Sequence, residues 1–155
     1  MRSPEDTVPE SWHRFFGSTA NNAAWALAEL PANQVDHREL LNAAHAAAWH
    51  WHAIGTELQR MRALMLLAQA HAQAGLGVTA LAYADEMSSY FLSAPNAPDW
   101  EVAFTHVVHA HAASTAGAQS QHAHSYARAV KALAAIAEAE DRAIVERVFR
   151  NVPAP

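Results

Sequence analysis

Histidines with metal-ligand spacing are the most chemically suggestive feature of this chain of 155 residues. Five of its eleven histidines fall within residues 105–127. His106 and His109 are three residues apart, which places both on one face of a helix. A following antiparallel helix would carry His122 toward that face. Three imidazoles with an open fourth position are a zinc-type arrangement, so His106, His109 and His122 are a candidate site for a divalent metal such as zinc.

The same histidines also fit a structural role, as partly buried polar residues that bond to hydroxyls or carbonyls. Metal-bound histidines are usually oriented by a carboxylate, and none lies near them in the sequence. The His-Ala-His motifs at 109–111 and 122–124 cannot each chelate one ion within a helix, because residues two apart point about 200° apart. Both interpretations stay open from the sequence alone.

A second candidate site, for a small ligand or a partner, consists of His45, Trp49, His50 and Arg62. His45 and Trp49 are four residues apart and share a helix face. They would line a pocket against the next helix, where the Arg62 guanidinium suits an anionic ligand. The alternative is that Trp49 packs in a groove between helices and His45 covers its edge.

Recognised catalytic motifs are lacking in the sequence. It contains no HExxH, no P-loop, no GxGxxG and no serine in a G-x-S-x-G nucleophile elbow. Histidine can act as a general base, but nothing here specifies a substrate. The catalytic residues, and whether the protein is an enzyme at all, therefore stay unassigned.

Composition narrows the class of protein. The formal net charge of −5 argues against nucleic-acid binding, which usually needs a basic face. The absence of cysteine excludes disulfides, iron–sulfur clusters and thiol nucleophiles. No apolar run approaches the roughly 20 residues that span a membrane, and the first residues lack a signal-peptide pattern. We expect a cytoplasmic protein that binds neither nucleic acid nor membrane.

The apolar spacing is helical almost everywhere. Alanine and leucine dominate, β-branched residues are few, and glycine and proline fall mostly between periodic stretches. Asp36, Thr56 and Asp99 are in position to cap helices. We expect an all-α fold of about seven helices in antiparallel hairpins, at about residues 10–29, 37–54, 57–74, 78–92, 100–116, 119–137 and 140–150.

A degenerate repeat underlies the hairpins. Aligning Gly75 with Gly117 brings residues 64–84 and 106–126 into one register with an offset of 42. Small residues such as Ala80 and Ala110 then mark close helix contacts. This pattern resembles the tetratricopeptide signature, although alanine occupies most of its aromatic and glycine positions. We expect a single domain over residues 1–155, a tetratricopeptide-like right-handed array, with loose termini at 1–9 and 151–155.

Four stretches resemble a family of short bacterial tetratricopeptide-like proteins of uncharacterised function. They are AAHAAAWHW (43–51), AQAHAQAGLGVTALAYA (68–84), DWEVAF (99–104) and AEAEDR (137–142), and the resemblance covers roughly residues 20–150. It implies a helical-hairpin fold and no particular reaction. The positions that match the family pattern are His45, Trp49, His50, Trp51 and Arg62. His106, His109 and His122 depart from it, since the family tends to carry Tyr, Leu and Ala there.

Two functions are compatible with these features. The first is a small helical-repeat binding module that presents a groove to a peptide, a protein partner or a small ligand. The alternative is a histidine-based metal or small-molecule site within the helices, with enzymatic activity as an extension of that site. A homodimer is a further option, with Trp12, Phe15 and Phe16 as the candidate contact.

Overall fold

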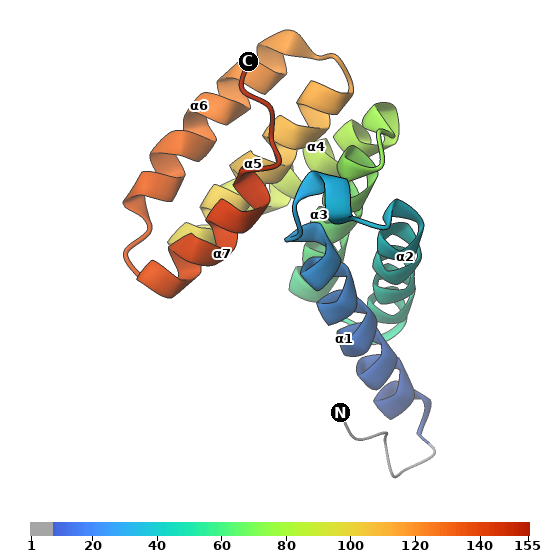
Figure 1. Ribbon diagram of the computed structural model, residues 1–155. Coiled ribbons are helices and arrows are strands. Elements are labelled where there is room, and N and C mark those ends of the chain that lie inside the picture. The colour runs from blue at the N-terminus through green and yellow to red at the C-terminus, as the bar shows by residue number, and fades with distance from the viewer. Residues whose placement is uncertain (1–7) are drawn as a thin grey trace.

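The computed structural model describes residues 8–155, and these form seven α-helices and one short 3-10 helix without any strand (Figure 1). The all-α expectation is therefore confirmed. None of the helices in this part of the chain combines the length and the apolar character needed to cross a bilayer. The helices are α1 (Pro9–Ala28), η1 (Ala32–Gln34), α2 (His37–Ile54), α3 (Glu57–Gln73), α4 (Gly77–Ser93), α5 (Asp99–Thr115), α6 (Gln119–Ala135) and α7 (Ala139–Phe149).

Side-chain caps start two of the helices as predicted. Asp36 accepts hydrogen bonds from the first-turn amides of α2, and Thr56 forms a capping box with Gln59 at the start of α3. Asp99 differs from the prediction, because Pro98 is the cap residue and Asp99 is the first residue of α5. One Asp99 oxygen accepts from its neighbour's amide at 2.8 Å, and the other accepts from the amide of Ala137 at 2.9 Å. Asp99 thus ties the start of α5 to the connection between α6 and α7.

The backbone of the two central hairpins repeats with the predicted offset. The α3–α4 and α5–α6 hairpins each consist of two helices of 17 residues. Gly75 and Gly117 both have left-handed φ, 78° and 73°, which glycine adopts without strain. Just past each glycine, a backbone N–H donates to a carbonyl in the last turn of the preceding helix at 2.9 Å. Both turns are therefore Schellman-type helix ends.

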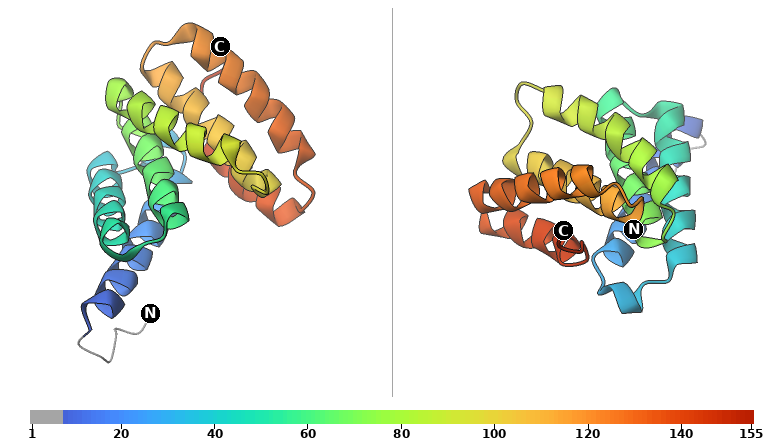
Figure 2. Two further views of the ribbon diagram at one scale, coloured as in Figure 1. Left: turned by 180° about the vertical axis from the view of Figure 1, so that it is seen from behind. Right: turned by 90° about the horizontal axis from the view of Figure 1, so that it is seen from above.

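The odd-numbered helices pack against one another in chain order. α3 contacts both α1 and α5, and α5 also contacts α7, while each even-numbered helix packs chiefly on its neighbours in sequence. Figures 1 and 2 show that α1–α3 and α5–α7 run in clearly different directions, with α4 between the two groups. The odd-numbered helices thereby share one face of the molecule.

Small residues allow these helices to approach closely. Ala80 and Ala110 are fully buried, as the repeat register predicts. A Cβ atom on Gly77 would collide with the carbonyl oxygen of Thr115, so only glycine fits where the start of α4 crosses the end of α5. Large side chains such as Phe91 and Leu66 fill the space around these contacts.

The sequence predicts a loose end at 151–155, and residues 151–153 of this segment contact the rest of the fold. The Val152 side chain is buried. Asn151 Nδ2 donates to the carbonyl oxygen of Leu30 at 2.9 Å, and His122 Nε2 donates to that of Pro153 at 2.8 Å. These contacts hold the chain end against the η1 connection and α6. The loose N-terminal segment predicted at 1–9 falls mostly outside the described residues, and α1 already begins at Pro9.

Candidate functional site

The three histidines predicted as a metal site do not converge. His109 uses both ring nitrogens, since Nδ1 bonds to Ser125 Oγ and Nε2 to Asp85 Oδ1, each at 2.8 Å. His122 instead faces the C-terminal segment, where its Nε2 bonds to the backbone. Within residues 8–155 no group of three His, Asp or Glu side chains is placed to hold a metal ion. The hydroxyl and carbonyl partners agree with the structural interpretation of His109 and His122.

His106 and His111 are buried imidazoles held in the neutral form. The pKa of His106 is lowered to about 4, first by burial and then by the nearby charges of Arg128, His109 and His124. Burial is also the main cause that lowers the pKa of His111 to about 4, with His122 as a second cause. Near neutral pH both side chains are therefore uncharged, buried side chains of α5.

Asp85, His109 and Ser125 have the connectivity of a serine hydrolase triad, but their surroundings do not suit nucleophilic catalysis. Ser125 is 5% exposed and lies in the interior of α6. The N–H groups beside it serve the hydrogen bonds of the helix itself, so no pair of donors forms an oxyanion hole. The three side chains instead join α4, α5 and α6 through a partly buried polar bridge.

The second predicted site is divided between two faces. Trp49 is 73% exposed, and His45 is an exposed side chain of α2 whose ring lies 5.1 Å from that of His71. His50 bonds to His13 of α1, with 2.9 Å between the two Nδ1 atoms. Arg62 instead points to Glu101 of α5, so it does not join the other three residues.

The histidines of this region are shifted toward the neutral form. Burial is the first cause that lowers the pKa of His45, and the charge of His71 is the second. Burial and then the charge of His13 lower the pKa of His50. A hollow of about 440 Å³ does lie between α2, α3 and α4, but none of the four predicted residues lines it. Its lining residues are Ala48, His52, Arg60, Met61, Ala63, Leu64, Leu67 and Glu86.

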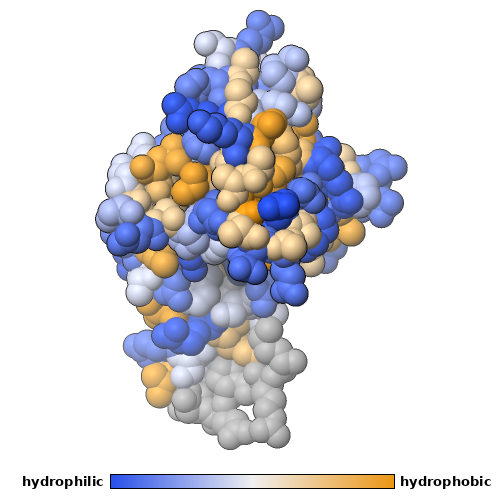
Figure 3. All heavy atoms as spheres, turned by 90° about the vertical axis from the view of Figure 1, so that its left-hand side faces the viewer, coloured by the Kyte–Doolittle hydropathy of each residue, from blue (hydrophilic) through white to orange (hydrophobic). Residues whose placement is uncertain are grey.

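The candidate dimer contact is an aromatic cluster near the start of α1. The rings of Trp12, Phe15 and Phe16 contact one another with centroids 5.3–6.4 Å apart. Phe16 also lies against His50 at 5.7 Å and is itself exposed. Figure 3 shows several separate apolar patches among hydrophilic residues on the side of the molecule that it presents. Exposure of apolar residues therefore does not single out one surface as a site.

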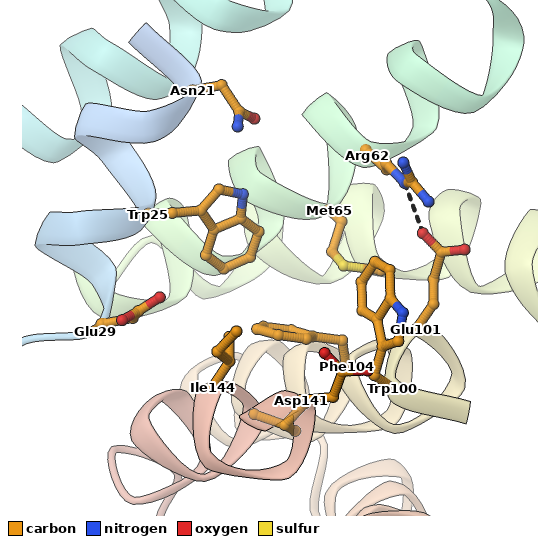
Figure 4. Close-up of a pocket in the computed structure, with 11 residues that line it drawn as sticks. Asn21, Trp25, Glu29, Arg62, Met65, Trp100, Glu101, Phe104, Asp141 and Ile144 are labelled. Atoms are coloured by element: carbon orange, nitrogen blue, oxygen red, sulfur yellow. Dashed lines mark hydrogen bonds and ion pairs between the residues drawn. The ribbon is translucent and has the colours of Figure 1, made fainter. Parts of the chain in front are cut away.

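A second cavity lies on the face that the odd-numbered helices share. It has a volume of about 290 Å³, and α1, α3, α5 and α7 all contribute to its walls (Figure 4). We call it the odd-helix groove. Its lining residues are Asn21, Trp25, Glu29, Arg62, Met65, Trp100, Glu101, Phe104, Asp141, Ile144 and Val145.

Aromatic rings form the walls of the odd-helix groove. Trp25 meets Phe104 edge to face, with centroids 5.1 Å apart and planes at 70°. Trp100 meets Phe104 in the same manner at 6.5 Å and 88°. Figure 4 shows Met65 between the two indoles and Ile144 near the Phe104 ring. These interlocked rings hold the cavity in a fixed shape without filling it.

Charged side chains surround this apolar lining. Arg62 Nε donates to Glu101 Oε1 at 2.7 Å, and the Glu101 carboxylate is almost fully buried. The Arg62 guanidinium also lies over the Trp100 ring, 5.5 Å from its centroid, which is a cation–π contact. Glu29 accepts from Arg147 at 2.7 Å. In the described part of the chain, neither a hydrogen bond nor an ion pair engages the Asp141 carboxylate.

Of the site residues predicted from the sequence, only Arg62 lines this groove. Trp100 and Glu101 lie within DWEVAF, a stretch singled out only by its family resemblance. The missed signal is that Trp25, Arg62 and Trp100 all lie on odd-numbered helices, which share a concave face in stacked hairpins.

Comparison of this chain with family models, with curated proteins and with solved structures finds no match.

Proposed function

We propose that this protein is a tetratricopeptide-like helical-repeat module that binds a segment of a partner protein in the odd-helix groove. The observation that carries the proposal is a cavity of about 290 Å³ with apolar and aromatic walls from four helices. Preformed apolar pockets with a few converging polar groups are typical binding sites. The groove has room for one large side chain of the partner, with the rest of the segment lying along the helices.

The arrangement of the hairpins supports the repeat part of the proposal. The two central hairpins repeat with an offset of 42, and their equivalent glycines have the same backbone conformation. Odd-numbered helices that contact one another in chain order are typical of stacked helical hairpins. Stacked helical hairpins form concave surfaces that suit such a ligand, and the groove lies between the odd-numbered helices.

Peptide selection followed by blocking of the groove tests this function. A displayed peptide library is selected on the purified protein, and the affinities of the enriched peptides are measured by isothermal titration calorimetry. Ile144 is 39% exposed at the groove, so Ile144→Trp fills the opening without removing a core side chain. We expect affinity to fall at least about tenfold, since one buried apolar side chain contributes roughly 1.5–3 kcal/mol.

The control is Leu92→Trp, which adds the same indole at a 49% exposed position of α4 that does not line the groove. This variant should bind the selected peptides as the unmodified protein does. The proposal is wrong if the enriched peptides bind both variants equally well.

A further inference from the structure

The carboxylates that line the odd-helix groove are not all paired with a cation. Arg62 neutralises Glu101, and Arg147 neutralises Glu29, through ion pairs of 2.7 Å each. Asp141, on α7, is the remaining charged residue of the lining, and it is only partly buried. Asp141 is therefore the one lining carboxylate without an ion pair among the described residues, and it lies beside the aromatic walls.

From this unpaired carboxylate, and on the basis of the proposed function, we infer that the groove recognises a basic side chain, a lysine or an arginine, on the partner segment. The long aliphatic stem of such a residue suits the apolar walls formed by Trp25, Phe104 and Ile144. Its charged end would reach the Asp141 carboxylate at the edge of the cavity. A cation also gains from the negative faces of the surrounding aromatic rings.

Arg62 shows that these rings accept a cation. Its guanidinium lies 5.5 Å from the centroid of Trp100 while its Nε is bonded to Glu101. Arg62 occupies one end of the groove, as Figure 4 shows, whereas Asp141 comes from α7 on the side of Phe104 and Ile144. The intramolecular contact thus satisfies one carboxylate and leaves the other for a partner.

An anionic ligand suits the groove less well, although Arg62 is partly exposed. The Glu101 side chain is 4% exposed and depends on Arg62 for its ion pair. Drawing Arg62 toward a ligand carboxylate would leave a buried charge without its partner, which is costly. The ligand would also bring a second negative charge close to Asp141. Charge complementarity therefore favours the cation.

Three probes with the same hydrocarbon chain separate charge from apolar contact. They are n-hexylamine, protonated at neutral pH, together with 1-hexanol and hexanoate. Binding is followed by NMR through the indole N–H signals of Trp25 and Trp100. The variants Trp25→Phe and Trp100→Phe identify these two signals among those of the five tryptophans.

At low salt we expect hexylamine to bind about fivefold more tightly than hexanol, as one partly solvated charge pair would give, and hexanoate to bind most weakly. Asp141→Asn should bring the affinities of hexylamine and hexanol together. Glu140→Gln removes the same charge from an exposed neighbour that does not line the groove. It should leave most of the preference intact.

The outcomes distinguish the two proposals. If hexanol shifts the two indole signals but hexylamine binds no more tightly than hexanol or hexanoate, the groove is still a binding site, and the proposed preference for a cation is wrong. If none of the probes shifts these signals, the groove itself is overturned, and the cation inference with it. A preference that survives Asp141→Asn unchanged would also overturn the inference, since it would assign the selectivity to another residue.

Discussion

Gln69 of α3 and His111 of α5 are bonded to each other although they are 42 residues apart, so each occupies the same position in its hairpin. Gln69 Nε2 lies 3.2 Å from His111 Nδ1, and both side chains are buried. If Gln69 donates, the His111 proton is on Nε2, which requires the neutral ring. Equivalent positions of the two repeats thus form a polar contact at the centre of the fold.

This contact and the burial of His106 make stability dependent on pH. The pKa values of His106 and His111 are both about 4 in the folded protein, below the ordinary value of 6.5. Between these values the unfolded chain binds more protons than the folded protein, so stability is full above pH 6.5 and falls as the pH drops toward 4. Each histidine contributes at most about 1.4 kcal/mol per pH unit in that window.

Chemical denaturation between pH 7.5 and 4 measures this loss. His106→Gln should reduce the slope of the free energy of unfolding against pH, because the variant has one buried titrating group fewer. The exposed His37→Gln is the control and should leave the slope as it is. Equal slopes for the two variants would show that His106 does not carry the effect.

Ala110→Leu should destabilise the protein by roughly 1–3 kcal/mol. Ala110 is fully buried in α5, and a larger side chain there would push neighbouring helices apart. Thermal unfolding checks this against Ala127→Leu, an exposed position of α6 that should change stability by less than about 0.5 kcal/mol. An unchanged midpoint for Ala110→Leu would contradict the close helix contact.

His109→Leu should lower the free energy of unfolding by about 1–3 kcal/mol, because it leaves the buried Ser125 hydroxyl without its hydrogen-bond partner. The loss should be the same with added zinc and with a chelator, since the bonds of His109 are to Ser125 and Asp85. A double-mutant cycle with Ser125→Ala isolates the pair and should give a coupling of at least about 0.5 kcal/mol. Additive effects would argue against the bridge, and stability that depends on zinc would restore the metal-site hypothesis.

Gly77→Ala should be more destabilising than Gly75→Ala. At Gly75 a Cβ has free space, and the cost is the left-handed backbone, about 1–2 kcal/mol. At Gly77 the Cβ would collide with the carbonyl of Thr115, which forces α4 and α5 apart. Denaturant unfolding of the two variants gives the order, and the reverse order would contradict the close approach of the two helices.

The sequence by itself determined the helices and the repeat that joins them. Their boundaries follow from local chemistry: Thr56 and Gln59 begin α3, and the left-handed glycines 75 and 117 end α3 and α5. Only the tertiary structure decided which side chains meet. The helical pattern places Arg62 on one face of α3, but it does not show which neighbouring helix that face contacts. The partners of Arg62, Trp100 and Glu101, come from α5. Likewise, the spacing of His109 allowed a metal ligand, but packing brought Asp85 of α4 and Ser125 of α6 to its two nitrogens. The crossing angles between helices set these meetings, and they depend on how all the side chains interlock at once, which no short sequence pattern encodes.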